Sequence, residues 1–186
     1  TVGCAGGVNI VLKSMLNRGD EVIVLNPFFW EFKNYVENFG GIAKFVDTKP
    51  YFQLDVEKIE RAVTDKTKAV LINSPNNPAG VVYNEESLRQ LADLLYAERK
   101  KGRDIYIISD EAYRKLVYAD CTLPELFHIY DWVISATSHS KDLALPGERI
   151  GYIAINPAYK EREPLINGCV YCNRILGFVN APALMQ

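Results

Sequence analysis

Short, continuously apolar segments alternate along this chain with longer segments whose apolar residues recur at helical spacing. This alternation constrains the fold more than any other feature. We predict strands at residues 22–25, 42–46, 69–72, 105–108, 132–134 and 152–155. Several of them are apolar at every position, which is typical of strands covered on both faces in a parallel sheet. Repeated strand–helix–strand order therefore predicts an α/β fold, with three α/β/α layers around a mostly parallel sheet.

The segments between the strands carry helix signals. The first predicted helix has its apolar face at residues 8–16 and ends by Gly19, and the second covers residues 56–63. The third begins after Asn84, whose side chain can cap it, and ends at Gly102. A length of 186 residues without repeats or low-complexity linkers predicts one domain, residues 1–186.

The composition argues against several kinds of partner. Hydrophobic residues make up 48% and charged residues 24%, as in ordinary soluble globular proteins. A net charge of −2 gives no reason to expect nucleic acid or an anionic membrane as a partner. No apolar run approaches the roughly eighteen residues of a membrane span, and the first residues have no signal-peptide pattern. We therefore expect a cytoplasmic protein.

The chain starts without a methionine and in the middle of a glycine-rich motif, so we expect it to be part of a longer protein. It contains four cysteines, of which Cys169 and Cys172 form a C-x-x-C pair. No second pair completes a zinc set, so we expect free thiols and no metal. A redox pair is the alternative, and the surrounding residues do not favour it.

Candidate functional residues follow the predicted strands, where open α/β sheets bind ligands. The segment that contains Gly3, Cys4 and Ala5 precedes the first predicted helix. Its small residues and the helix dipole would suit a phosphate, and a simple tight turn explains the pattern equally well. Phe29 belongs to an aromatic run that could stack on a flat cofactor, although core packing is the simpler interpretation. In the loop at residues 73–80, prolines fix the position of amide donors such as Asn77.

Two charged residues need special surroundings. Asp110 follows the strand at 105–108, and a buried carboxylate there needs a partner, either a protonated ring nitrogen or an arginine. Lys141, in the segment Ser-His-Ser-Lys that begins at Ser138, becomes a nucleophile only near other cations or in a desolvated pocket. Most lysines are instead solvated surface charges. Arg149 could bind a phosphate through two hydrogen bonds.

Ser-Pro-Asn-Asn-Pro at 74–78, Ser-Asp-Glu-Ala-Tyr at 109–113 and Ser-His-Ser-Lys at 138–141 occur in this order, followed by Gly-Glu-Arg-Ile-Gly-Tyr at 147–152. In this order and spacing they resemble the class I/II aminotransferases of the fold-type I pyridoxal-phosphate family. The resemblance covers essentially the whole chain. It implies the large, cofactor-binding domain of that family, with pyridoxal 5'-phosphate as the cofactor.

The resemblance also implies roles for single residues. Lys141 looks like the lysine that forms the Schiff base and shuttles a proton, and Asp110 like the aspartate that keeps the pyridine nitrogen protonated. Tyr113 and Asn77 match the pair that contacts the phenolic oxygen of the cofactor. Phe29 matches the stacking aromatic, without the polar group that Trp or Tyr has there.

The phosphate site implied by the resemblance consists of Gly3, Cys4, Ala5, Ser138 and Arg149. The family would transfer an amino group between an amino acid and a 2-oxo acid, as a homodimer. Its small domain and N-terminal segment would lie outside this chain, so we expect residues 1–186 alone to be inactive. Two alternatives stay open: a carbon–sulfur lyase of the same fold, and the aminotransferase-like sensor domain of a winged-helix transcription regulator. Ala79 and His139 depart from the residues common in the family at their positions.

Overall fold

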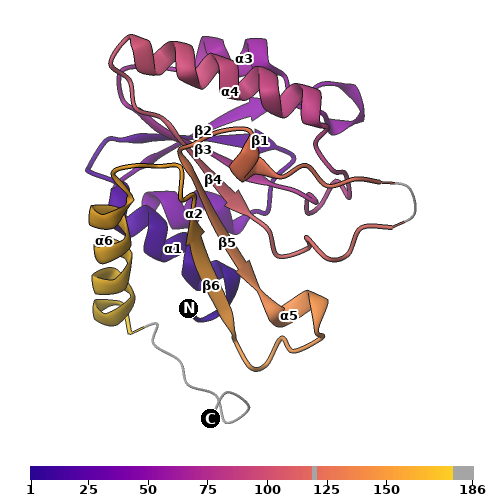
Figure 1. The fold of residues 1–186 in the computed structure, drawn as a ribbon, viewed down its shortest axis with the longest axis vertical. Coiled ribbons are helices and arrows are strands. Elements are labelled where there is room, and N and C mark those ends of the chain that lie inside the picture. Colours follow the sequence, from indigo (N-terminus) through magenta and orange to yellow (C-terminus); the bar gives the residue numbers. More distant parts are fainter. Residues whose placement is uncertain (119–120, 178–186) are drawn as a thin grey trace.

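A six-stranded sheet forms the centre of the computed structural model, which describes residues 1–118 and 121–177 (Figure 1). The strand order is β2-β1-β3-β4-β5-β6. Neighbouring strands from β2 to β5 run parallel, and β6 runs antiparallel to β5. The mostly parallel sheet predicted from the sequence is therefore confirmed. The strands are β1 (Glu21–Asn26), β2 (Ile42–Asp47), β3 (Thr67–Asn73), β4 (Tyr106–Asp110), β5 (Val133–Ser138) and β6 (Gly151–Ile155).

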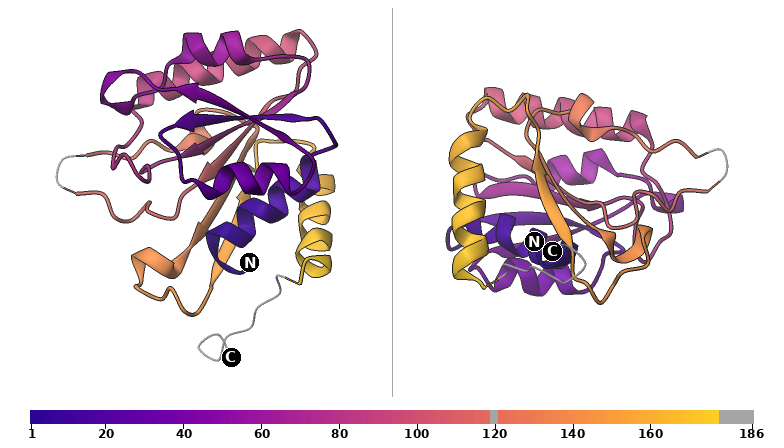
Figure 2. Two further views of the ribbon diagram at one scale, coloured as in Figure 1. Left: turned by 180° about the vertical axis from the view of Figure 1, so that it is seen from behind. Right: turned by 60° about the horizontal axis from the view of Figure 1, so that its bottom comes forward.

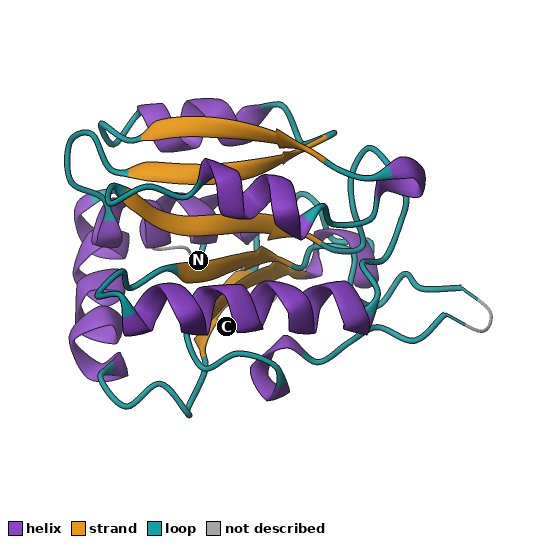
Figure 3. Cartoon of the chain, turned by 90° about the horizontal axis from the view of Figure 1, so that it is seen from above, coloured by secondary structure: helices purple, strands orange, loops and turns teal. Residues whose placement is uncertain are grey.

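Helices cover both faces of the sheet, which confirms the three layers (Figures 1 and 2). One face carries α1 (Gly3–Met15), α2 (Glu31–Glu37) and α6 (Arg162–Ile175), and the other carries α3 (Val56–Ala62) and α4 (Glu85–Lys100). The short helix α5 (His139–Asp142) follows β5, and 3-10 turns lie at η1 (Pro50–Phe52) and η2 (Leu126–His128). Figure 3 shows the strands side by side between the two helical layers.

Side chains that alternate along each strand enter two separate cores. In β1, Val22 and Val24 pack under α1 and α2, whereas Ile23 and Leu25 pack under α3 and α4. Both sets are buried. A strand whose two faces are both covered favours apolar residues at successive positions, which explains the continuous apolar runs in the sequence.

Helix α1 begins earlier than the sequence predicted. The apolar pattern placed the helix at residues 8–16, but it starts at Gly3 and ends at Met15. Glycine is a poor helix former, so the glycine-rich start gave no helix signal. Close packing explains why it is helical: a Cβ at Gly7 would lie 3.1 Å from the Cβ of Ala136 in β5. The cap predicted for α4 is confirmed, because the Asn84 side chain accepts a hydrogen bond from Ser87 N at 2.8 Å.

Gly151, the first residue of β6, packs closely against the start of α1. A Cβ at this position would lie 2.4 Å from the carbonyl oxygen of Thr137 and 2.8 Å from the backbone carbon of Gly3. Both neighbours are backbone atoms, which cannot move aside without shifting a strand or a helix. Only glycine therefore allows the connection from β5 to β6 to approach α1 this closely.

We predict that Gly151→Ala lowers the free energy of unfolding by about 1–3 kcal/mol or more, because the new methyl group overlaps backbone. Gly147→Ala is the matched control, since a Cβ there meets nothing within 4 Å. It should change stability by no more than about 0.5 kcal/mol. Urea unfolding of both variants measures the difference, and equal effects would contradict the close approach.

Candidate functional site

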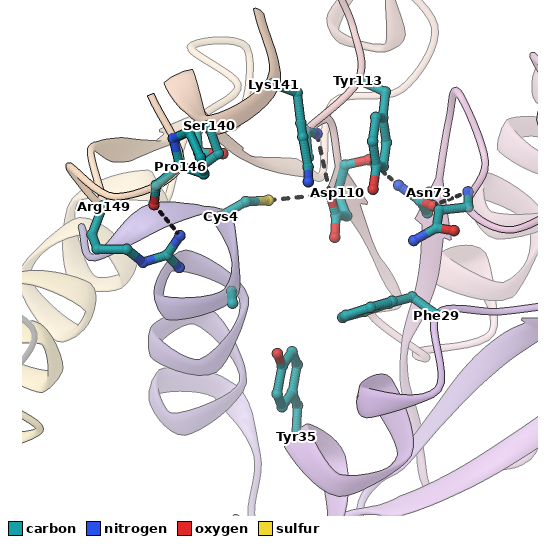
Figure 4. Close-up of a pocket in the computed structure, with 14 residues that line it drawn as sticks. Cys4, Phe29, Tyr35, Asn73, Asp110, Tyr113, Ser140, Lys141, Pro146 and Arg149 are labelled. Atoms are coloured by element: carbon teal, nitrogen blue, oxygen red, sulfur yellow. Dashed lines mark hydrogen bonds between the residues drawn. The ribbon is translucent and has the colours of Figure 1, made fainter. Parts of the chain in front are cut away.

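A pocket at the carboxyl ends of β3, β4 and β5 collects nearly all the residues that the sequence singled out (Figure 4). The expected residues that line it are Cys4, Ala5, Phe29, Asn77, Asp110, Tyr113, Ser138, Lys141 and Arg149. Gly3 does not line the pocket but lies directly against Arg149. The sequence reasoning assigned no site role to five further lining residues, Tyr35, Asn73, Ala112, Ser140 and Pro146.

Asp110 is the last residue of β4, and its carboxyl group is buried. Its Oδ1 accepts hydrogen bonds from Cys4 Sγ at 3.1 Å and from Ala112 N at 3.2 Å. Burial raises the pKa of Asp110; the Cys4 and Ala112 hydrogen bonds oppose this, and the charge of Glu111 adds to it. Burial thus favours the neutral acid unless a positive group binds it.

The sequence left open whether an arginine neutralises Asp110. The nearby Arg114 instead pairs with Glu111 at 3.2 Å and with Glu125. Within residues 1–118 and 121–177, no lysine or arginine lies within ion-pairing distance of Asp110. The carboxyl group therefore faces the pocket ready for a ligand that brings positive charge or a hydrogen-bond donor.

Asn73 holds the neighbouring loop in place. It is the last residue of β3, and its Nδ2 donates to the carbonyl of Asp110 at 3.0 Å. Its Oδ1 accepts from the backbone N–H of Asn77 at 2.7 Å, which places Asn77 at the pocket. Asn76, by contrast, uses its amide inside the loop, with Tyr83 and Ala79 as partners. Its position at the end of a strand, paired with Asp110 across the sheet, was the signal that could have identified Asn73.

Tyr113 and Asn77 form the polar pair that the sequence predicted. Burial raises the pKa of the Tyr113 hydroxyl, the charge of Asp110 raises it further, and a hydrogen bond from the Asn77 side chain lowers it. The hydroxyl is therefore protonated at neutral pH and available to a ligand. The aromatic wall of the pocket comes from Phe29, which packs edge-to-face on Phe32 with ring centroids 5.6 Å apart.

Lys141 lies in α5, and its Nζ is 5.9 Å from the ring centroid of Tyr113. The side chain is exposed, and so are Leu143 and the following Ala144. The desolvated surroundings expected for a reactive lysine are therefore not supplied by the described residues alone. A bound ligand or a neighbouring chain segment would have to cover this amine.

Asp142 ties the lysine helix to the tyrosine turn. Helix α5 has only 4 residues and no side-chain cap, so it cannot be stable by itself. Asp142 Oδ2 lies 3.1 Å from Lys115 Nζ and 3.2 Å from His139 Nδ1. Burial alone would raise the pKa of Asp142, but Lys115 and His139 hold it below its usual value. Lys115 follows Tyr113 in the same turn, so this contact sets α5 beside Tyr113.

We predict a favourable coupling between Asp142 and Lys115 in a double-mutant cycle of Asp142→Asn and Lys115→Gln. The coupling should stay below about 1 kcal/mol, because Lys115 is exposed. Because folding lowers the pKa of Asp142, its stabilising effect is present above about pH 4 and is lost as the pH falls through the folded pKa. Urea unfolding of the four proteins of the cycle, near pH 7 and below pH 3, measures the coupling free energy. If the effects of the two single substitutions simply add near pH 7, the contact between Asp142 and Lys115 does not stabilise the protein.

The start of α1 and Arg149 bring groups that favour anions close together. Gly3 has a φ of +67°, and a Cβ there would lie 2.7 Å from Arg149 Nη2, so the guanidinium covers the glycine. No acceptor among the described residues bonds the backbone N–H of Cys4 or Ala5, both in the first turn of the helix. Ser138, buried at the end of β5, lies at the same pocket. These donors, the helix dipole and Arg149 are suited to a phosphate.

Other functional signals are absent from the part of the chain that the structure describes. No helix there is long and apolar enough to cross a membrane. No group of three or more His, Cys, Asp or Glu residues there could hold a metal ion. Cys169 and Cys172 are buried free thiols in α6 and contribute to the core under α1.

Curated relatives of this chain are aminotransferases. A probable aspartate aminotransferase of Methanocaldococcus jannaschii is 32% identical over 170 residues, which cover 91% of this chain and 44% of that protein. The aspartate aminotransferase of Thermotoga maritima is 40% identical over 144 residues, which cover 75% of this chain and 37% of that protein. The chain thus spans less than half the length of these relatives.

Solved structures agree with these relatives. An amino transferase from Eubacterium rectale superposes with a TM-score of 0.96 at 38% identity, covering 100% of this chain and 48% of that one. The Thermus thermophilus aspartate aminotransferase with maleate gives a TM-score of 0.85 at 31% identity, covering 100% and 46%. The family model for aminotransferase class I and II matches residues 1–181. The chain belongs to the class I and II aminotransferase family, whose members depend on pyridoxal phosphate.

Proposed function

We propose that this chain binds pyridoxal phosphate, and that the protein to which it belongs transfers an amino group between an amino acid and a 2-oxo acid. One observation carries the proposal. A buried acid without a cationic partner among the described residues, an amine and a group of anion-binding donors meet at one pocket, although Gly3 and Arg149 lie far apart in the sequence. A cofactor with a ring nitrogen, an aldehyde and a phosphate needs these three groups.

The residues of the pocket fit the cofactor one group at a time. The free N–H groups of Cys4 and Ala5 and the guanidinium of Arg149 would hold the phosphate. Asp110 would pair with the protonated ring nitrogen, which would remove the cost of burying its charge. Tyr113 and its partner Asn77 would contact the ring hydroxyl. Phe29 and Ser138 line the same pocket, where Phe29 would contact the ring and Ser138 the phosphate.

When bound, pyridoxal phosphate supplies an electron sink that makes the Cα–H bond of an amino acid acidic. Lys141 would provide the amine that holds the cofactor; once the amino group of the substrate has replaced it, the freed Lys141 amine would take up and return the Cα proton. Asp110 would keep the ring nitrogen protonated, and Tyr113 would donate a hydrogen bond to the ring oxygen. Asp142 fixes α5, so that Lys141 works from one position.

The names of the relatives support an aminotransferase. No observation favours either of the two alternatives, the lyase or the transcription-regulator sensor. Relatives in Aquifex aeolicus and Thermus aquaticus are named probable aspartate/prephenate aminotransferases. Aspartate is therefore the first amino donor to test. We propose an amino acid and a 2-oxo acid as this protein's partners, since the net charge of −2 gives no reason to add nucleic acid or a membrane.

We also propose that residues 1–186 form the large domain of a longer cytoplasmic enzyme that is a homodimer. The relatives' length and the open surroundings of Lys141 support this, because other chain segments would have to cover the amine. Leu143, 56% exposed beside the pocket, is suited to such a contact. By the same reasoning, residues 1–186 alone are expected to lack transaminase activity.

Reductive trapping tests the proposal. The full-length protein, incubated with pyridoxal phosphate and reduced with borohydride, should carry the pyridoxyl mass on the peptide that contains Lys141. Lys141→Ala should abolish both this labelling and amino transfer from aspartate or another amino acid. Lys33→Ala, which removes an exposed lysine of α2, is the matched control and should change neither. Unchanged labelling in the Lys141→Ala variant would contradict the proposed function.

A further inference from the structure

The Cys4 side chain points away from the anion-binding donors and toward Asp110 (Figure 4). Its Sγ lies 3.1 Å from Asp110 Oδ1 and also 3.1 Å from the carbonyl oxygen of Ala136 in β5. The side chain is buried. A thiol has one hydrogen, so it donates to only one of these two acceptors at a time.

The two acceptors differ in how much they need this hydrogen. The Ala136 carbonyl already accepts a hydrogen bond from Glu111 N at 2.8 Å. It stays satisfied when the thiol turns away. Asp110 is more than nine-tenths buried at the pocket and has no cationic partner among the described residues. Within residues 1–118 and 121–177, the other donor to its carboxyl group is the backbone N–H of Ala112. An ionised carboxylate therefore gains more from the thiol than the carbonyl does.

The thiol is suited to donate and not to react. Burial raises the pKa of Cys4 well above its usual value, and the charge of Asp110 raises it further. It therefore stays protonated at neutral pH, and a protonated thiol is a poor nucleophile. The thiol also belongs to the apolar core under α1. It thus supplies a hydrogen bond to Asp110 without adding a charge to the site.

We infer that Cys4 is a positioning residue for Asp110: the thiol lies within hydrogen-bond distance of both Ala136 O and Asp110 Oδ1, and when a protonated ring nitrogen binds the carboxylate the thiol donates to Asp110 Oδ1 alone and holds the carboxylate in place. The inference rests on the proposed function. It gives Cys4 two roles, since its backbone N–H is one of the anion-binding donors and its side chain serves the other end of the cofactor. The first turn of α1 then couples phosphate binding to the orientation of Asp110.

The S–H stretching band in the infrared tests this directly. The spectrum of the full-length protein minus that of Cys4→Ala isolates the Cys4 band, without and with pyridoxal phosphate. We expect the band to move to lower frequency on cofactor binding, because a carboxylate is the stronger acceptor. A band that keeps its frequency while the cofactor binds would overturn the inference.

A second measurement separates positioning from folding. Cys4→Ala should weaken cofactor affinity about fivefold, or roughly 1 kcal/mol. It should also shift the acid limb of the kcat profile to higher pH, because Asp110 loses a donor that lowers its pKa. Cys4→Ser keeps a donor and should restore part of both effects, and urea unfolding shows whether each variant is folded. If Lys141 is never labelled, the proposed function fails; if labelling is normal and neither variant alters affinity or the acid limb, only the role of Cys4 fails.

Discussion

The buried carboxyl group of Asp110 is the constraint on which the rest of the site depends. A charge buried without a partner costs several kcal/mol, and burial here raises the pKa of this acid. In the described part of the chain, its hydrogen-bond donors are neutral: the Cys4 thiol from α1 and the Ala112 N–H from the loop after β4. Their arrangement suits a neutral acid, and an ionised Asp110 needs a cationic ligand, which is why we propose that the pocket binds the cofactor.

The β5–β6 connection lies close against the start of α1, and this contact brings the other groups of the site near the Asp110 carboxyl. It depends on backbone positions where a side chain would be out of place, namely Gly3 under the Arg149 guanidinium and Gly151 against Thr137. Arg149 itself has a φ of +53°, an uncommon value for a non-glycine residue that fits a functional position. By contrast, Asp142 ties the short helix that carries Lys141 to Lys115, and the Lys141 side chain is exposed. The acid and anion parts of the site are thus built within this chain, whereas the cover of Lys141 is not.

The sequence predicted the fold because burial on both faces leaves a continuous apolar run, as at residues 69–72. It also indicated that Asp110 and Ser138 would lie at one edge of the sheet, because each follows a predicted strand, and both line the pocket. It did not predict that α1 begins at Gly3, since packing against β5 overrides the weak helix propensity of glycine. Nor could it predict the contacts of Cys4 with Asp110 or of Asp142 with Lys115. Each contact joins two segments that are far apart in the sequence, and neither contact leaves a local sequence pattern.

The most direct test of this account is an NMR titration of the Asp110 carboxyl carbon in full-length protein labelled with ¹³C at aspartate Cγ. Asp110→Asn assigns the signal. Without cofactor, the account predicts a pKa above the ordinary aspartate value of about 3.9. With pyridoxal phosphate bound, it predicts a carboxylate that stays ionised to lower pH, because the protonated ring nitrogen now neutralises it. An Asp110 signal that titrates identically with and without bound cofactor would contradict the account.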